Sequence, residues 1–256
     1  MIADLIYDIG MHKGEDTKFY LQKGYRVVAV EANPALVAQV SAELKSFIDD
    51  GKLIIVNEGI AEKEGSMTFY RNDHELEWSS FDKAIGTRDN TPFAEMLVPC
   101  RTAASLLAEY GIPYYLKIDI EGYDPICING IESIDNAPAY ISCEASSIEC
   151  LEALIAKGYR QFKLINQARN FTPFSLTTEQ NALGNFIQQK WNRAKLRLQK
   201  FIPFKYNFGT SGPFGEETPG RWMDADYIRK AYYQFYSEPS NKPINNLSWF
   251  DIHAKK

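Results

Sequence analysis

The chain has 256 residues, of which 45% are hydrophobic and 24% charged, and its formal net charge at pH 7 is −5. This length suits one large α/β domain or a domain with a sizeable insertion, and the composition is ordinary for a globular protein. Binding to nucleic acid without sequence preference requires a basic field, so the acidic balance argues against a DNA or RNA substrate.

Hydropathy and cysteine spacing bear on the cellular location of the protein and on whether it has zinc sites or disulfides. No apolar run approaches the ~20 residues that a membrane span requires. The first predicted strand begins almost at Met1, which leaves no room for a signal peptide, so we expect a cytoplasmic protein. The cysteines have no C-x-x-C spacing and no grouped histidine, which predicts neither a zinc site nor a disulfide framework (Cys100, Cys127, Cys143 and Cys150).

Strands and helices alternate through the first two thirds of the chain. Short apolar runs that stop at polar or glycine-bearing turns predict buried strands at Leu5–Tyr7, Val27–Val30, Leu53–Val56, Tyr114–Ile118, Ala139–Cys143 and Phe162–Ile165. A helix is predicted over Glu15–Lys23, and a second begins at Pro34. Residues 66–70 read as a short extra strand, one side of a hairpin. This alternation indicates right-handed crossovers and a mostly parallel sheet with helices on both faces.

The composition changes after residue 166. A turn-rich loop over Phe208–Glu217 has aromatics at both ends, and a helix with an aromatic stripe is predicted over Trp222–Tyr236. A basic run over Phe186–Tyr206 is interpreted as a solvated helix face, with a phosphate-bearing or anionic-glycan acceptor as the alternative. Leu247–Ile252 predicts a seventh, antiparallel strand. We therefore expect a core over 1–166, an aromatic-rich acceptor-binding lid over 167–245 and a final strand over 246–256.

The turn after the first strand has the pattern D-x-G-x-x-x-G, from Asp8 through Gly10 to Gly14. Glycines are needed where backbone approaches a ligand closely or takes a positive φ. The helix N-terminus that follows offers free N–H groups to a carboxylate, with Asp16 and Thr17 as side-chain contacts. A pyrophosphate site requires three glycines at another spacing, so the turn favours the methionine end of S-adenosylmethionine (SAM) over a dinucleotide.

Acidic residues end four of the predicted strands. Glu31, which follows the second strand, can accept both hydroxyls of a ribose. Asp119 and Glu144 end two further strands, and open α/β sheets place their ligands at this carboxyl edge. Together with Asp8, these side chains predict one acidic crevice that suits a cationic sulfonium cofactor.

Several segments resemble the FkbM-like methyltransferases. The most specific is L-K-I-D-I-E-G at Leu116–Gly122, followed by Ile128-Asn129-Gly130, and the resemblance covers about residues 4–165. It implies a Rossmann-like class I fold with a seven-stranded sheet and O-methylation of a sugar hydroxyl. It also implies SAM contacts from the first turn and second strand end, adenine contacts, and a serine segment beside the cofactor (Asp8, Gly10, Gly14, Glu31, Ala32, Gly59, Ile60, Ser79 and Ser80). Met11-His12-Lys13 departs from the family pattern of a small residue and asparagine.

Methyl transfer to a hydroxyl needs alignment of the acceptor oxygen with the methyl group and removal of a proton. Asp119 is the first candidate for the base, because the fourth strand of this fold ends next to the methyl group. The other candidates are Glu121, Glu144, His12 and His74. Glu121 can instead cap a helix that begins near Gly122, and Asp119 with Glu121 can instead bind a divalent cation, although no third ligand is evident and no metal is expected.

The sequence thus predicts a SAM-dependent O-methyltransferase with a carbohydrate or glycoconjugate acceptor. Three alternatives stay open: an N- or C-methyltransferase of a small metabolite, a nucleotide-dependent oxidoreductase, and a non-catalytic SAM-binding partner of a glycan assembly complex. The DNA-methylating enzymes usually carry an Asn/Asp-Pro-Pro-aromatic motif after the fourth strand, whereas this chain has Asp119-Ile120-Glu121-Gly122. The oligomeric state is left open.

Overall fold

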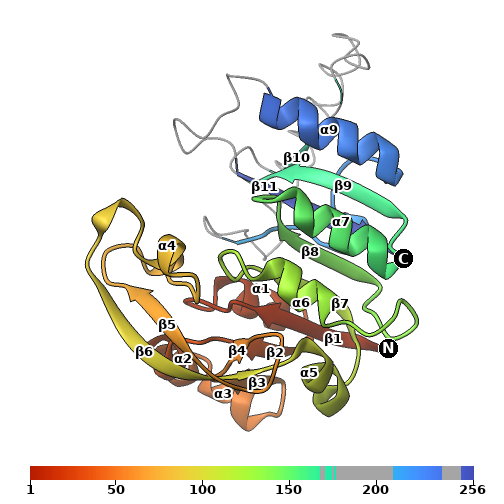
Figure 1. The fold of residues 1–256 in the computed structure, drawn as a ribbon. Helices are drawn as coiled ribbons and strands as arrows, with labels where there is room; N and C mark the ends of the chain where they lie inside the picture. The colour runs from red at the N-terminus through yellow and green to blue at the C-terminus, as the bar shows by residue number, and fades with distance from the viewer. Residues whose placement is uncertain (168–170, 175, 177–209, 238–248) are drawn as a thin grey trace.

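The computed structural model describes residues 1–167, 171–174, 176, 210–237 and 249–256, and its centre is a large twisted sheet (Figure 1). Eight strands form this sheet in the order β10-β9-β11-β8-β7-β1-β2-β3. Their bounds are Ile2–Ile9 (β1), Arg26–Val30 (β2), Leu53–Val56 (β3), Pro113–Ile118 (β7), Tyr140–Glu144 (β8), Gln161–Asn166 (β9), Thr172–Pro173 (β10) and Phe250–Lys255 (β11). All six strands predicted in the first two thirds of the chain are present.

Strand direction in the large sheet follows from the chain order. β1 pairs in parallel with β2 and β7, β2 with β3, and β7 with β8. β11 is antiparallel to both β8 and β9, between which it lies. The expected antiparallel last strand is therefore present, but it covers residues 250–255 instead of 247–252. The expected number of seven strands is wrong, because the two-residue β10 adds an eighth along β9.

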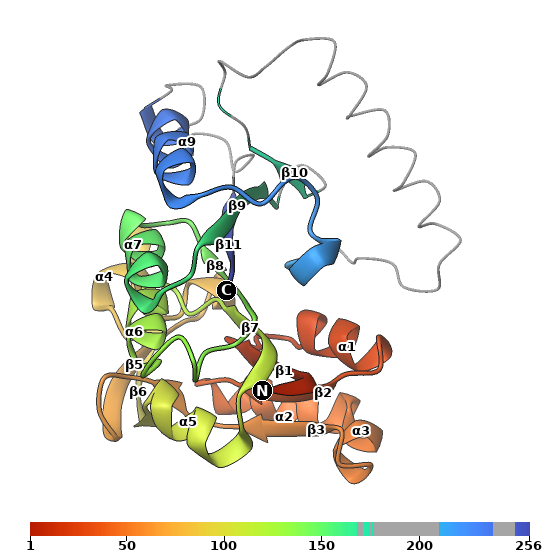
Figure 2. The same cartoon turned by 90° about the vertical axis from the view of Figure 1, so that its right-hand side faces the viewer.

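Two hydrophobic clusters lie on opposite faces of the sheet, as the alternation along β1 requires. Leu5, Tyr7 and Ile9 pack on one face and Ile6 on the other. The first face is covered by α5 (Ala103–Tyr110), α6 (Asp124–Asn129), α7 (Ile148–Lys157) and α9 (Ala225–Ser237), and the second by α1 (Glu15–Gln22) and α2 (Pro34–Glu43), which continues into α3 (Lys45–Asp49). Figure 2 shows helices on both faces of the sheet, as predicted.

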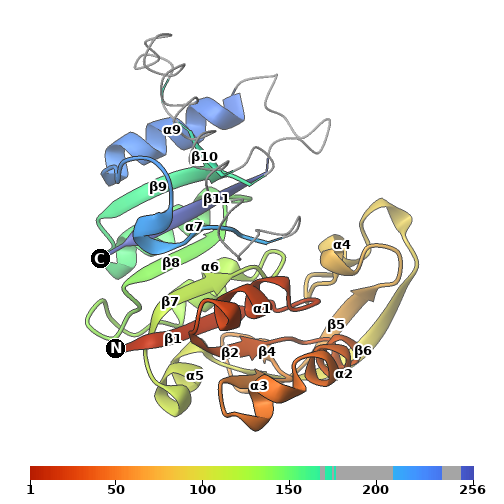
Figure 3. The ribbon, with the colours of Figure 1, turned by 180° about the vertical axis from the view of Figure 1, so that it is seen from behind.

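A second, three-stranded sheet has the order β4-β6-β5, with bounds Gly59–Ile60, Phe93–Arg101 and Gly65–Asn72. β5 confirms the extra strand expected at residues 66–70, and its antiparallel partner β6 was not predicted. Between them the chain forms η1 (Leu76–Trp78), α4 (Lys83–Gly86) and η2 (Arg88–Asn90). Figure 3 shows this sheet beyond the carboxyl ends of β1 and β2.

The described parts of the segment after residue 166 pack against the core. α9 begins at Ala225, three residues later than predicted, and buries Ile228, Tyr232 and Phe235. The ring of Phe214, just before η4 (Gly215–Glu217), stacks on Tyr115 at 4.7 Å between centroids. The basic run over 186–206 lies outside the described residues. Within the described part of the chain, no helix has the length and apolarity needed to cross a membrane.

Candidate active site

A cavity of about 400 Å³ opens at the carboxyl ends of the parallel strands. Its lining follows the strand order, from Glu31 after β2, through Gly10 after β1 and Asp119 after β7, to Glu144 at the end of β8 and Trp249 before β11. Residues of the small sheet and the segment that follows β5 complete the wall (Gly59, Ile60, Phe69, Leu76, Glu77, Ser79, Ser80 and Phe81). The strand-end carboxylates predicted to share a crevice, apart from Asp8, therefore line one cavity.

The turn after β1 is held tightly between the two neighbouring strands. The backbone N–H groups of Gly10 and Met11 donate to the Val30 carbonyl at 2.9 and 3.0 Å, and the Asp119 N–H donates to the Ile9 carbonyl at 2.9 Å. Gly10 has φ +85°, and a Cβ there would lie 1.9 Å from the carbonyl oxygen of Asp119. Glycine is required here both by the left-handed backbone and by this close approach.

Three of the predicted cofactor residues lie outside the cavity lining. Asp8 is fully buried, and its Oδ2 accepts a 2.6 Å hydrogen bond from the Thr17 hydroxyl. Gly14 is the left-handed N-cap of α1, and a Cβ there would meet the Val40 side chain at 2.9 Å. These three residues hold the turn and the start of α1 in place, and their contacts with the cofactor stay a prediction.

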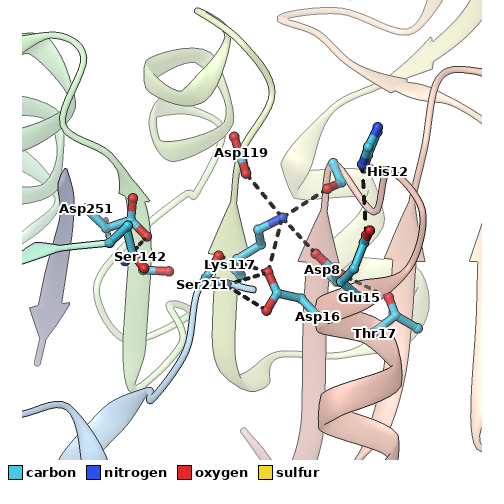
Figure 4. A network of polar contacts seen from close by, with 12 residues as sticks. Asp8, His12, Glu15, Asp16, Thr17, Lys117, Asp119, Ser142, Ser211 and Asp251 are labelled. Atoms are coloured by element: carbon cyan, nitrogen blue, oxygen red, sulfur yellow. Dashed lines mark hydrogen bonds and ion pairs between the residues drawn. The ribbon is translucent and has the colours of Figure 1, made fainter. Parts of the chain in front are cut away.

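Asp16 lines the cavity but already has protein partners. Its carboxylate accepts hydrogen bonds from the Ser211 backbone N–H at 2.9 Å and from the Ser211 hydroxyl at 2.9 Å (Figure 4). Burial raises the pKa of Asp16 to about 7, against the opposing effect of Lys117. Asp16 therefore connects the segment that contains Ser211 to the turn after β1.

Glu31 is 8% exposed and faces the cavity with its neighbour Ala32. The carboxylate accepts the backbone N–H groups of His12 and Asn33, each at 2.8 Å. Burial raises the pKa of Glu31 to about 7, although these two N–H groups favour its charged form. A buried carboxylate oriented by backbone donors is suited to accept hydroxyl groups from a ligand in the cavity.

The walls around Glu31 are apolar and flat. Gly59 and Ile60 line the cavity, and a Cβ on Gly59 would come within 2.3 Å of the Phe81 ring. Ser80 is buried in the same wall, and its hydroxyl donates to the Glu121 carbonyl at 2.8 Å. The Phe81 ring therefore packs directly on the backbone of Gly59, and together they form an apolar wall that suits one face of a flat heterocycle such as adenine.

Three carboxylates meet at the other end of the cavity. The Asp119 side chain is 39% exposed and lies 3.5 Å from the Lys117 ammonium. Glu121 has φ 41° and pairs with Arg88 at 3.1 Å. Burial, with repulsion from Glu144, raises the pKa of Glu121 to about 8, and burial, with repulsion from Asp119, raises the pKa of Glu144 to about 7. The alternative that Glu121 caps a helix is wrong, because α6 begins at Asp124 and its N-cap is Tyr123.

The two histidines considered as bases differ in position. His12 lines the cavity between Glu15 and Glu77, whose carboxylates lie 3.9 and 3.8 Å from the imidazole nitrogens. Burial lowers the pKa of His12 despite both carboxylates. The His74 side chain is 67% exposed and lies outside the lining. In the described part of the chain, no group of three or more acidic, histidine or cysteine side chains is placed to hold a metal ion.

Several residues of the site were not predicted. Lys117 belongs to the L-K-I-D-I-E-G motif, but no role was predicted for it. It lies near the end of β7, two residues before Asp119, and its ammonium is 3.5 Å from that carboxylate. Ser211 and Trp249 reach the site from segments far away in sequence, and nothing local to them indicates this. Asp251 is buried opposite Glu144 in the register of β8 and β11.

The order of the large sheet, with one antiparallel strand inserted next to the last parallel strand, defines the Rossmann-like class I methyltransferase fold. The family model of the methyltransferase FkbM domain matches residues 8–171. The chain therefore belongs to the FkbM methyltransferase family, and its cofactor is SAM.

Solved structures of methyltransferases are similar to the chain at low identity. Methyltransferase FkbM from Methylobacillus flagellatus KT is 17% identical, with a TM-score of 0.44, over 64% of this chain and 40% of that one. The O-methyltransferase from Bacillus cereus in complex with S-adenosylhomocysteine (SAH) is 12% identical, with a TM-score of 0.32, over 99% and 74%. A TehB-like SAM-dependent methyltransferase from Corynebacterium glutamicum is 10% identical, with a TM-score of 0.37, over 69% and 76%. No curated protein matched the chain.

Glu31→Gln is expected to weaken SAH binding about 10- to 100-fold at pH 8, because hydrogen bonds to a charged group contribute roughly 1.5–3 kcal/mol. Since the pKa of Glu31 is raised to about 7, the carboxyl holds its proton below this pH and loses it above. The affinity of the unmodified protein should therefore rise between pH 6 and 8, and that of Glu31→Gln should rise less. Calorimetry checks this, with the exposed Glu62→Gln as the control. Equal affinity and pH dependence in Glu31→Gln would contradict the assignment.

Proposed function

We propose that the protein transfers the methyl group of SAM to a hydroxyl of a sugar or glycoconjugate. The observation that carries this proposal is the position of Asp119 in the cavity. It follows β7, which lies between β1 with its glycine turn and β8 with Glu144. A carboxylate at this boundary can contact both a cofactor held on the β1–β2 side and an acceptor held on the β8 side.

The cofactor half of the site comprises Gly10, Asp16, Glu31, Ala32, Gly59, Ile60 and Ser80, all of which line the cavity. Glu31 suits ribose hydroxyls, and the apolar wall formed by Gly59, Ile60 and Phe81 suits one face of adenine. Asp8, Gly14 and Thr17 support the turn from behind. When bound, SAM supplies an electrophilic methyl group on a positively charged sulfur, and the acidic lining favours a cation.

The chain must bring an acceptor hydroxyl to the methyl group and take up its proton. Positioned general bases contribute about 100- to 10,000-fold to such reactions. Asp119 is our first candidate for this base, since it belongs to both halves of the cavity. Glu121 and Glu144 flank it, with pKa values raised to about 8 and about 7, and His12 faces the cavity from the turn. These three side chains are the alternative bases.

The acceptor half favours a neutral or cationic ligand over an anionic one. Among the described lining residues, Asp119, Glu121 and Glu144 lie in this half, and Lys117, the lysine beside them, is itself surrounded by carboxylates. Trp249 adds an aromatic surface, which suits the apolar face of a sugar ring. We further assign residues 167–245 as the acceptor-binding segment. A cytoplasmic location is part of the proposal and is supported by four cysteines that are all free and buried.

Transfer of an isotope-labelled methyl group from SAM tests the proposal. The panel of acceptors should contain neutral sugars, amino sugars, sugar phosphates and small amines. We expect label on a hydroxyl oxygen of a neutral sugar or amino sugar, and none on the sugar phosphates. Label on nitrogen or carbon of a small metabolite would favour the N- or C-methyltransferase instead, and no transfer to any acceptor despite SAH binding would favour a non-catalytic SAM-binding protein.

Binding of NAD tests the last alternative function, that of a nucleotide-dependent oxidoreductase. A nucleotide-dependent oxidoreductase would bind NAD in preference to SAH. The turn after β1 has Gly10 and Gly14 as its only glycines, and a pyrophosphate site requires a third. We therefore expect calorimetry to detect SAH binding and no NAD binding, and the reverse result would overturn the proposed function.

A further inference from the structure

Lys117 is a charged side chain buried at the centre of the site. Its side chain is 5% exposed, and its ammonium donates a 2.9 Å hydrogen bond to the carbonyl oxygen of Gly10. Three carboxylates surround the same Nζ: Asp8 at 3.2 Å, Asp119 at 3.5 Å and Asp16 at 3.8 Å. Figure 4 shows Lys117 between these groups, which come from β1, the end of β7 and α1. One ammonium therefore contacts both the cofactor turn and the candidate base.

The ammonium remains charged in this position. Burial alone would lower the pKa of Lys117, but Asp8, Asp119 and Asp16 outweigh it and raise the pKa well above its usual value. Replacement of a buried charge by a neutral side chain leaves its partners without compensation, which is strongly destabilising to their charged forms. Asp8, Asp16 and Asp119 therefore share one compensating positive charge.

The electrostatic surroundings of Asp119 make this dependence pronounced. Apart from Lys117, the charged groups around it in the described part of the chain are carboxylates and the more distant Arg88, which is paired with Glu121. The carboxylates come from every element packed at this point: β1, α1, the turn after β7, α6, β8 and β11 (Asp8, Asp16, Glu121, Asp124, Glu144 and Asp251). Without Lys117, the Asp119 carboxylate would face these carboxylates with no adjacent cation.

We propose that Lys117 is a positioning residue for methyl transfer, which fixes the cofactor turn and the Asp119 carboxylate relative to each other and supplies the positive charge beside that carboxylate. The proposal rests on the proposed function, in which Asp119 removes a proton from the acceptor. Lys117 does not itself contact the acceptor in this role. It acts through Asp119 and through the carbonyl of Gly10.

Lys117→Met and Lys117→Arg test this role by kinetics. For Lys117→Met we expect kcat at pH 7 to fall at least about 10-fold, and the acidic limb of kcat against pH to move upward by about one pH unit or more. Lys117→Arg keeps the charge, so its acidic limb should stay in place while kcat falls through altered geometry. The matched control is Lys163→Met on β9. Lys163 is also buried, at 3% exposure, but lies outside the cavity lining, so this change should leave the acidic limb of kcat against pH unchanged.

A readout that needs no acceptor separates this proposal from the proposed function. In protein labelled with ¹³C at aspartate carboxyl groups and bound to SAH, the Asp119 resonance is identified by its loss in Asp119→Asn. We expect it to titrate at higher pH in Lys117→Met than in the unmodified protein. If Lys117→Met does not fold, the double variant Asp8→Asn/Lys117→Met removes a buried carboxylate together with its counter-charge. An unchanged titration and an unchanged acidic limb would overturn the proposal, whichever acceptor the enzyme uses.

Discussion

Asp119→Asn is expected to lower kcat about 100- to 10,000-fold, which is the usual contribution of a positioned general base. Asparagine has nearly the same shape but cannot accept the acceptor's proton. The side chain is 39% exposed toward the cavity, so the change should leave the fold intact. The SAH dissociation constant should stay within about threefold, because Glu31 and the Gly10 turn are untouched. Steady-state kinetics and calorimetry measure the two quantities separately.

Three variants distinguish Asp119 from its neighbours. Glu144→Gln and Glu121→Gln should lower kcat less than Asp119→Asn, since Glu121 is paired with Arg88 and Glu144 lies one strand farther from the cofactor turn. The exposed Asp135→Asn makes the same chemical change away from the site and should have no effect. If Asp119→Asn retains activity while Glu144→Gln abolishes it, the base is Glu144.

Gly10→Ala is expected to destabilise the protein by about 2–5 kcal/mol and to weaken SAH binding. A left-handed alanine costs roughly 1–2 kcal/mol, and overpacking adds about 1–3 kcal/mol. The overpacking arises because the new Cβ would lie 1.9 Å from the Asp119 carbonyl oxygen, a backbone atom with no freedom to rotate away. The free energy of unfolding from denaturant titration measures the first effect, and calorimetry with SAH measures the second.

Gly24→Ala is the matched control for this change. Gly24 also has a positive φ, of +93°, but a Cβ there would meet no atom within 4 Å. It should therefore lose only the roughly 1–2 kcal/mol of backbone strain and keep its affinity for SAH. Equal losses in the free energy of unfolding in both variants would show that the close approach of the β1 turn to Asp119 does not contribute to the cost of Gly10→Ala.

The large sheet could be predicted because its strands carry their own signals. Val27–Val30 is buried on both faces and therefore reads as a continuous apolar run. Leu53–Val56 is also a continuous apolar run, although Ile54 on this edge strand is exposed. The residue at the end of such a run is placed by the strand itself, so Glu31, Asp119 and Glu144 could be assigned to one cavity before their neighbours were known. Gly10 was identified for the same reason, since its turn follows β1 directly.

The missed parts of the site depend on contacts between distant segments. β6 alternates exposed and partly buried residues along most of its length, so its sequence lacks a strong apolar run. β10 is two residues long and exists through its pairing with β9. The bond from Ser211 to Asp16 joins residues 195 positions apart.

A crystal structure of the protein with SAH and a neutral sugar tests the central claim most directly. The account predicts SAH along the β1–β2 side of the cavity, with its ribose hydroxyls on Glu31, its adenine against the wall formed by Gly59, Ile60 and Phe81, and its sulfur facing Asp119. It also predicts a sugar hydroxyl within hydrogen-bond distance of the Asp119 carboxylate. SAH bound outside this cavity, or a sugar hydroxyl that faces the sulfur with Asp119 turned away, would contradict it.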